Sequence, residues 1–438
     1  MNKTSSPGDT VAFRFRLVAV AVACVFGPAS LRAQTMDEMR DELKRLRAEV
    51  NDLRRDKTAE VAPVAAQPSD SAGWGDRIKS LEAKAKDAVV VDDTGLGLRF
   101  PGSGTSLRIY GLAEAHAIHD FGQSGSPDLF TDLTFQPLDK VGGPKGKTKF
   151  TAETSRFGFE TTTPIASETL KTKVEADFYS YGVDNRNRVR LRQAYGEYGG
   201  WLIGQTWSTF MDLDDLPETV DFNGPIGAPF SRRAMVRYSF GDAKAGYKFT
   251  FAAEDPEDQF GGGSANERMP QLVARVDKNF DRVAVNARVL AHEKRSFSQT
   301  KRGFGVGVGG SYKLSDNDLL MGQYTRVDGD VDQLYGSNGY AIDATTGSIT
   351  FDKNQGLVLG YARTFTSQLR GNAVLGFNRG KSAQAVDNKS LSELFVNLIY
   401  SPMKNVDLGG ELIVGRRKTF DGDTGKLTRL DLMGRYSF

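Results

Sequence analysis

The chain of 438 residues contains one cysteine and only three histidines. Cys24 lies in an apolar N-terminal stretch, so its removal with an export signal would exclude disulfides and thiolate metal sites. Cys24 could instead accept a lipid, but Val25 follows where a small residue is expected. His116 and His119 would point in opposite directions on a strand. No cofactor and no metal are therefore expected.

Long hydrophobic runs and a strong net charge are also lacking. Past the N-terminus no run approaches the ~18 apolar residues that a membrane-spanning helix needs, which excludes a helical membrane protein. The formal net charge of the whole chain is +2. Residues 1–33 contribute four basic side chains and one acidic side chain, so a chain without them has a charge of about -1. This balance gives no indication of nucleic acid as a partner.

The N-terminus has the pattern of a secretory signal. Lys3, Arg14 and Arg16 precede an apolar stretch from 17 to 26, and Ala33 is a candidate cleavage position. The cleavage box is imperfect because Leu31 lies three residues before the cut, where a small residue is usual. We predict a signal peptide over residues 1–33.

Heptad spacing follows the signal peptide. The apolar positions repeat at alternating intervals of 3 and 4 residues, at Met36, Met39, Leu43, Leu46, Val50 and Leu53. This predicts a coiled-coil stalk over 34–57, which is too short to be stable alone and so needs partner chains. A single amphipathic helix lying on another surface is the alternative. Residues 58–92 are predicted to form an Ala/Pro linker and a short second helix.

In the remainder of the chain, apolar residues recur at every second position, as they do in a β-strand with one apolar face. In the last strand Leu430, Leu432, Tyr436 and Phe438 share one face, and Asp431, Arg435 and Ser437 share the other. A soluble sandwich would show similar alternation, but the export signal, the terminal Phe438 and the number of strands favour a membrane barrel. At about 10 residues per strand plus turns, residues 93–438 accommodate some 16 strands. We predict an all-β transmembrane barrel of about 16 antiparallel strands with an N-terminal α-helical coiled-coil extension.

Enzymatic motifs are weak in this sequence. The G-x-G-x-x-G spelling at 305–310 is followed by a strand pattern instead of a helix, so glycines that ease a barrel strand explain it better. Gly146-Lys147-Thr148 resembles the end of a P-loop, but Val141 stands where the first glycine is required. No G-x-S-x-G is present, so a hydrolase triad has little support, although a lipid-hydrolysing barrel could use Ser and His without it. The protein is not expected to be an enzyme.

Four arginines at every second position are the strongest indication of a functional site in the sequence. Arg186, Arg188, Arg190 and Arg192 would form a column about 7 Å apart on one face of a strand. Guanidinium groups stay charged and bind carboxylates bidentately, so this column predicts a cationic pore lining. Further candidates for the lining are Arg156, Lys171, Lys173, Arg233 and Arg237. The alternative is a solvated strand end with ordinary surface arginines.

An acidic segment follows the predicted strand 201–207. It contains Asp212, Asp214, Asp215, Glu218 and Asp221. In trimeric porins an acidic loop folds into the barrel opposite basic residues, and the field between the two sorts solutes by charge. We predict that this segment is a constriction loop; an ordinary extracellular loop is the alternative.

Several segments resemble the DcaP-like trimeric outer-membrane porin family. They are FPGSGTSLRIYG (100–111), VEADFY (174–179), LRQAYGE (191–197), GQTWSTFMD (204–212) and PETVDF (217–222). The similarity covers residues 36–438 and is densest between Phe100 and Phe240.

The resemblance implies a homotrimer that takes up small anionic solutes, such as dicarboxylates and aromatic acids, by passive diffusion. The same resemblance assigns Arg186, Arg188, Arg190, Arg192, Arg233 and Arg237 to the lumen. It implies the outer membrane of a Gram-negative bacterium, with the stalk in the periplasm and with outer-membrane lipid as a neighbour. The barrel assembly machinery would bind the C-terminal strand that ends at Phe438, and whether the stalk binds peptidoglycan is left open. A weakly selective general porin and a structural envelope protein with a coiled-coil tether are the alternatives.

Overall fold

The computed structural model describes residues 48, 90–91, 97–100, 102–124, 130–179, 188–259, 265–382 and 384–438. The predicted signal peptide lies outside the described residues, and so does the predicted stalk except for Ala48, which is helical. The chain divides into two units, 1–79 and 80–438. The described fold belongs to the second unit, and no helix among the described residues is long and apolar enough to cross a membrane.

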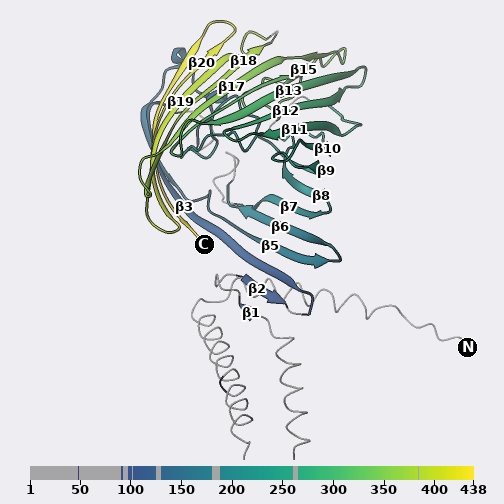
Figure 1. Ribbon diagram of the computed structural model, residues 1–438. Helices are drawn as coiled ribbons and strands as arrows, with labels where there is room; N and C mark the ends of the chain where they lie inside the picture. The colour runs from purple at the N-terminus through teal and green to yellow at the C-terminus, as the bar shows by residue number, and fades with distance from the viewer. Residues whose placement is uncertain are drawn as a thin grey trace, which may run out of the picture. The chain divides into compact units, whose positions relative to one another are not determined.

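Antiparallel strands form the wall of the second unit (Figure 1). In chain order the elements are β1 (Val90–Val91), β2 (Gly97–Phe100), β3 (Thr105–Gln123), the 3-10 helices η1 (Leu133–Phe135) and η2 (Asp139–Val141), β4 (Lys145–Thr151), β5 (Arg156–Ile165), β6 (Glu168–Asp177), β7 (Arg190–Tyr198), β8 (Trp201–Trp207), β9 (Arg232–Gly241), β10 (Lys248–Glu254), β11 (Gln271–Asn279), β12 (Val283–Arg295), β13 (Thr300–Lys313), β14 (Asp318–Asp328), β15 (Tyr340–Ile342), β16 (Ile349–Phe351), β17 (Lys353–Thr364), β18 (Leu369–Lys381), β19 (Asn388–Met403), β20 (Val406–Thr419) and β21 (Thr424–Ser437).

The sheet closes on itself because β21 pairs with β3. β4 and β5 pair with successive halves of β3 and so act as one interrupted strand, which leaves a wall of 16 strands. The last residue of the chain takes part in this closure. The Phe438 N–H donates to the Gly111 carbonyl at 2.9 Å, and the Gly111 N–H donates to the Phe438 carbonyl at 3.0 Å. The prediction of a closed barrel of about 16 antiparallel strands is confirmed.

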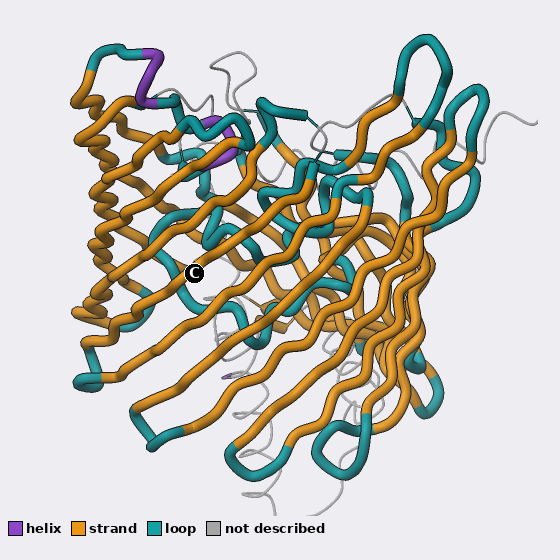
Figure 2. Tube along the Cα trace, turned by 90° about the horizontal axis from the view of Figure 1, so that it is seen from above, coloured by secondary structure: helices purple, strands orange, loops and turns teal. Residues whose placement is uncertain are grey.

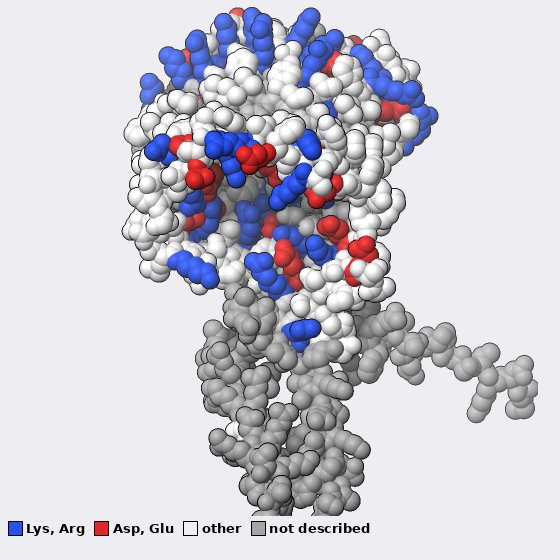
Figure 3. Space-filling model, viewed as in Figure 1, with Lys and Arg blue, Asp and Glu red and all other residues white. Residues whose placement is uncertain are grey.

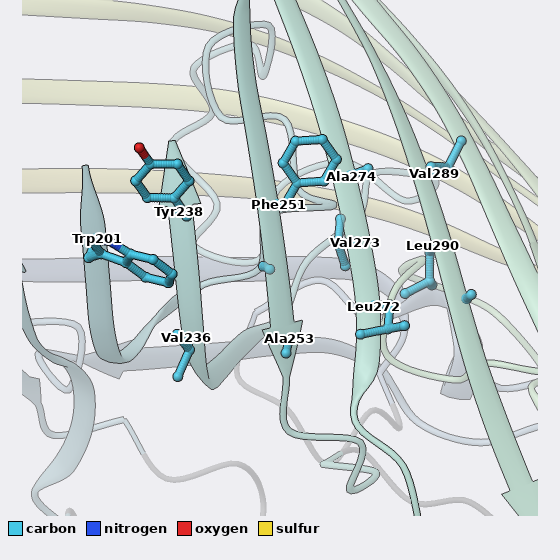
Figure 4. Close-up of a pocket in the computed structure, with 12 residues that line it drawn as sticks. Trp201, Val236, Tyr238, Phe251, Ala253, Leu272, Val273, Ala274, Val289 and Leu290 are labelled. Carbon is cyan, nitrogen blue, oxygen red and sulfur yellow. The ribbon is translucent and has the colours of Figure 1, made fainter. Parts of the chain in front are cut away.

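The two faces of each strand differ as the sequence predicts. On β19, Leu394, Val396 and Leu398 are exposed on the outside, whereas Glu393 and Asn397 are buried inside. An apolar outer face and a polar inner face are the signature of a barrel that crosses a membrane. Figure 4 shows part of this outer face, where the apolar side chains of β8–β12 line a shallow hollow around Ala253 and Ala274.

Turn and loop lengths give the barrel two different ends. Short turns such as 279–283 and 403–406 join strands at one end, and long segments such as 208–231 and 329–352 join them at the other. In barrels of the bacterial outer membrane the short turns face the periplasm. β7 and β8 have 9 and 7 residues, compared with 16 in β19. The wall is therefore low on the side of β7 and β8.

Three loops enter the barrel from its long-loop end. They are residues 130–141, which include η1 and η2, residues 208–231, and residues 329–339; Figure 2 shows loop segments inside the ring of strands. Leu133 and Ile226 pack in one buried cluster, and Phe210 and Leu334 pack in another. Tyr335 pairs with the second loop through backbone hydrogen bonds to Gly227 and Ala228, at 3.0 and 2.8 Å. The apolar core of this protein therefore lies between the loops and the wall.

Candidate pore constriction

The segment 208–231, called the inner loop below, follows the inside of the wall from β10 to β21. At its start the Glu254 carboxylate on β10 accepts hydrogen bonds from the Ser208 hydroxyl and the Thr209 N–H, both at 2.7 Å. In the middle, Glu411 on β20 accepts the N–H groups of Val220 and Asp221 at 3.0 and 2.8 Å.

Towards the end of the inner loop, the Glu393 carboxyl on β19 accepts the Ile226 N–H at 3.0 Å. Loop N–H groups that leave water need replacement acceptors. Three wall carboxyls thus fix the inner loop along its length.

Inward-facing glycines provide the space for this loop. A Cβ atom at Gly309 would overlap Asp212, and one at Gly360 would overlap Pro217. At Gly376 the added Cβ would lie 2.6 Å from the Ile226 carbonyl oxygen, and at Gly409 it would lie 2.9 Å from Val220 Cγ2. The 305–310 glycine run does belong to a barrel strand, as predicted. Its inward members additionally let the inner loop approach the wall closely.

Three of the five predicted acidic residues are buried. Asp212 and Asp215 accept hydrogen bonds from Asn286 at 2.7 and 3.0 Å, and Asp221 accepts the Thr131 N–H at 2.9 Å. Burial, together with the neighbouring Asp212 charge, raises the pKa of Asp215 to about 7. Burial also raises the pKa of Asp221, against the opposing effect of the Arg429 charge.

The other two predicted acidic residues reach open space. The Asp214 side chain is 86% exposed and lies 3.5 Å from the Arg275 guanidinium. Glu218 is 39% exposed and accepts two hydrogen bonds from Arg370, both at 2.9 Å. Asp214 and Glu218 are therefore the predicted carboxylates that a passing solute can meet.

The predicted arginine column is shorter than its sequence pattern suggested. β7 begins at Arg190, Arg188 precedes it, and Arg186 lies outside the described residues. Arg190 and Arg192 both face the lumen, next to a register shift between β6 and β7. Both are paired: Arg190 binds Asp177 at 2.9 and 2.7 Å.

Arg192 is shared between two carboxylates. It binds Glu175 at 2.7 Å and Asp177 at 2.8 Å. The charges of these two arginines are compensated by the two carboxylates, so the described part of the predicted column is not a row of unpaired positive charges.

Two neighbouring arginines are less fully satisfied. Arg156 Nε and Arg232 Nη1 are buried, and neither atom has a hydrogen-bond partner among the described residues. Arg232 lies within electrostatic reach of Arg156, Arg190 and Arg192. We call these four residues the arginine cluster. Their four charges exceed the two of Glu175 and Asp177, which leaves a local excess of positive charge.

Aromatic rings surround the arginine cluster. The Arg232 guanidinium lies 4.7 Å from the Trp207 ring centre, and Trp207 contacts Phe230 at 5.2 Å. Phe222 of the inner loop lies 5.9 Å from Arg190 and 5.7 Å from Arg192. The inner loop and the low wall therefore meet at this cluster. In Figure 3 the front of the barrel is hollowed, and both basic and acidic side chains line the hollow.

The remaining predicted basic residues differ in their exposure. Arg233 is fully buried and donates to Asp332 Oδ2 at 2.8 Å, so it fixes loops and has no surface for a solute. Lys173 binds Glu160 at 2.9 Å, whereas Lys171 lies exposed on the same face of β6. Arg237 on β9 is partly buried and has no carboxylate within 4.0 Å in the described part of the chain.

Sequence reasoning missed several functional contacts. It did not select Arg232, which contacts Trp207, or the lumen-facing Arg275, Arg288, Arg370, Arg429 and Arg435. It also missed the loop-binding carboxyls of Glu254, Glu393 and Glu411. The alternation of side chains along a strand could have identified several of these arginines as inward-facing. On β12, for example, Arg288 is next to the outward Val289 and must therefore point inward. Their partners could not be found, because they lie far away in sequence.

Metal binding has no structural support within the described ranges, where no group of three or more His, Cys, Asp or Glu side chains could bind an ion. His116 is buried 3.0 Å from Asp431 and 3.3 Å from Glu114. His119 hydrogen-bonds to Thr148 at 2.8 Å on the opposite face of β3.

Comparisons with known proteins agree with this architecture. The family described as DcaP outer membrane protein matches residues 99–438. The crystal structure of the outer membrane channel DcaP of Acinetobacter baumannii is 30% identical, covers 78% of this chain and 99% of that chain, and has a TM-score of 0.71. The comparison with curated proteins finds no match.

More distant outer membrane proteins share the fold alone. Salmonella typhi OmpF in complex with daunomycin is 15% identical over 77% of this chain and 99% of that chain, with a TM-score of 0.53. The trimer form of Vibrio cholerae OmpT is 13% identical over 76% and 99%, also with a TM-score of 0.53. The family match and the DcaP channel together make this protein an outer membrane channel, and the chain belongs to the DcaP outer membrane protein family.

Proposed function

We propose that this channel favours small anionic solutes, and that dicarboxylates and aromatic acids are its substrate class. The observation that carries the proposal is the pair of buried guanidinium N–H groups on Arg156 and Arg232, neither of which has an acceptor among the residues that the structure describes. Charged donors buried without acceptors are costly, and a carboxylate entering the cluster would supply the missing acceptors.

The surroundings of the arginine cluster suit an aromatic acid in particular. Trp207, Phe222 and Phe230 lie beside the guanidinium groups, so one end of a solute can bind charge while the other contacts rings. Arg237 lies five residues farther along β9, about 16 Å from Arg232, and has no carboxylate within 4.0 Å among the described residues, so it offers a separate contact for an anion along the lumen. Flux requires binding weak enough for release, and the partial neutralisation by Glu175 and Asp177 favours that balance.

The test is a reversal-potential measurement on Arg156→Gln/Arg232→Gln in a planar bilayer with a salt gradient. Removing the two least-satisfied charges should lower the ratio of anion to cation permeability severalfold. The matched control is Lys244→Gln/Lys404→Gln, which removes the same charge from exposed positions in the short turns after β9 and β19. An unchanged ratio in the arginine variant, or an equal fall in the control, would contradict the proposal.

A weakly selective general porin is the second candidate. It is favoured by the number of lumen arginines that are already paired, including Arg190, Arg192, Arg370 and Arg435. Under this alternative the reversal potential stays near zero, and solute size governs flux. A structural envelope protein is a third reading, motivated by the three loops inside the barrel. Folded protein that conducts nothing would favour it.

The assembly and the partners complete the proposal. We propose a homotrimer whose contact face includes the low wall, where Leu191, Trp201 and Ile203 are exposed outward. The N-terminal stalk would lie in the periplasm, and Phe438 would mark the strand that the barrel assembly machinery binds. Mass measurement of the intact complex tests the trimer. Binding of the stalk to peptidoglycan stays open to a pull-down with purified sacculi.

A further inference from the structure

A belt of basic side chains lies on the outer face of the barrel at its long-loop end. Its members, called the outer basic rim, are Lys353, Arg379, Lys381, Arg416, Lys418 and Lys426 on β17, β18, β20 and β21. Figure 3 shows Lys and Arg gathered along the upper edge of the barrel, where Figure 1 labels β18 and β20.

Parity places these side chains outside the barrel. Arg416 and Lys418 continue the outward series of Leu412 and Val414, and Arg379 continues that of Leu375. The rim is therefore the upper continuation of the apolar band. None of its six members has a carboxylate within 4.0 Å among the described residues.

Some basic side chains of the rim are direct cross-strand neighbours. Lys353 is the cross-strand partner of Lys381, and Arg416 is that of Lys426. Side chains paired in this way have Cβ atoms about 5 Å apart, and like charges in such pairs are destabilising. An anion placed between them would convert the repulsion into attraction.

Nearby carboxylates in the loops already have their own partners. Asp423 binds Lys140, Asp421 accepts from the Thr419 hydroxyl, and Asp387 accepts from Ser382. On the outer face of β12, by contrast, a carboxylate lies among the basic side chains. On β12, Glu293 lies 3.5 Å from Arg268 and 3.6 Å from Arg302. The outer basic rim is thus a group of six basic side chains on neighbouring strands with no carboxylate among them.

The height of the rim matches the lipid headgroups. Leu408, at the short-turn end of β20, lies ten residues before Lys418. Ten residues rise about 33 Å along a strand, or about 25 Å along the axis of a barrel tilted by about 40°, which equals the thickness of the apolar band. Arg416 and Lys418 therefore reach the headgroup level of the outer leaflet.

We propose that the outer basic rim binds the phosphate groups of a phosphorylated lipid in the outer leaflet, of the lipid A type. Two phosphates on one headgroup can bridge neighbouring strands and separate the opposed cations. This inference depends on the membrane orientation of the barrel and not on the anion preference of its lumen.

The test is native mass spectrometry of the full-length protein titrated with bisphosphorylated lipid A. The variant is Arg379→Gln/Lys381→Gln/Arg416→Gln/Lys418→Gln. Each basic residue near an anionic surface contributes roughly a fivefold gain in binding, so the variant should bind at least tenfold more weakly. Dephosphorylated lipid A should bind the parent protein about as weakly as the intact lipid binds the variant.

The matched control removes four exposed basic side chains from the opposite end, in Lys244→Gln/Arg282→Gln/Lys313→Gln/Lys404→Gln. Its lipid binding should equal that of the parent. The variant Lys381→Arg/Lys418→Arg should retain binding and thereby distinguish lost charge from a disturbed fold. Equal binding by the parent and the four-residue rim variant, or an equal loss in the control, would overturn the proposal.

Discussion

Replacing Gly376 with alanine should loosen the inner loop without opening the barrel. Gly376 lies on β18 directly opposite Glu393 of β19, and the Ile226 N–H reaches the Glu393 carboxyl across this glycine. The added Cβ would lie 2.6 Å from the Ile226 carbonyl oxygen and 3.0 Å from Pro225 Cβ. Ordinary contact begins at 3.4 Å, so the backbone at Ile226 must retreat by about 0.8 Å.

The magnitude follows from that shift. A retreat of about 0.8 Å lengthens the 3.0 Å hydrogen bond to Glu393 beyond any useful distance. The other oxygen of Glu393 is buried and has no hydrogen-bond partner among the described residues. Losing the donor costs about 1–3 kcal/mol, and overpacking adds about 1–3 kcal/mol. A total of about 2–6 kcal/mol shifts the docking equilibrium of the loop by at least thirtyfold.

Single-channel recording in a planar bilayer measures this effect. The Gly376→Ala protein should show a noisier open-channel current and a broader spread of conductances than the parent. The melting temperature of the barrel should change little, because the strand pairs remain. Gly410→Ala is the control: it adds a Cβ to the outer face of β20, 3.5 Å from Leu432 Cδ2, where an alanine fits.

Either of two results would refute the reasoning. If Gly376→Ala conducts as quietly as the parent, the Glu393 contact does not hold the inner loop. If Gly410→Ala becomes equally noisy, the effect arises from any glycine loss in the wall and not from the loop.

Three further predictions concern other parts of the chain. The pKa of Asp215 is about 7 in the docked loop, so the docked loop keeps a proton that an undocked loop loses near pH 4. Docking of the inner loop should therefore weaken as the pH rises from about 4 to 7. Open-channel noise measured from about pH 4 to 8 should follow this trend in the parent protein and lose it in Asp215→Asn. Deleting Phe438 removes two hydrogen bonds to Gly111, worth about 2 kcal/mol together, and should lower the folded fraction seen as heat-resistant mobility in electrophoresis. Leu43→Asp with Leu46→Asp should weaken stalk association in cross-linking while leaving the barrel trimer intact.

Strand alternation was predictable because it depends only on neighbouring residues. In β19 and β21 the inner and outer faces follow directly from the order of apolar and charged side chains. The strand count also followed from length, since a barrel has no room for long unpaired stretches in its wall. The paths of the inner loops were not predictable in the same way. Glu411 binds Asp221 across 190 positions, and no local pattern marks such a pair.

Site residues were harder to predict because burial depends on distant segments. Arg233 shares parity with Arg237, but the Asp255 and Glu257 carbonyls and Asp332 enclose it completely. In the same way, the predicted column from 186 to 192 assumed one continuous strand, whereas β7 begins only at Arg190. Parity identifies the face of a side chain, and only the folded loops decide whether that face meets solute.

The composition of the inner loop explains why its acidic character does not settle selectivity. Residues 208–231 contain no lysine or arginine, yet three wall carboxyls dock the loop through its N–H groups and hydroxyl. Most of its own carboxylates are occupied by wall donors, so acidic residues serve mainly to hold the loop in place. Exposed negative charge is left at Asp214 and Glu218, and each has an arginine nearby. Two arginines of the arginine cluster have buried donor atoms without a hydrogen-bond partner among the described residues, and the proposed preference for anions rests on these atoms and not on the acidic loop.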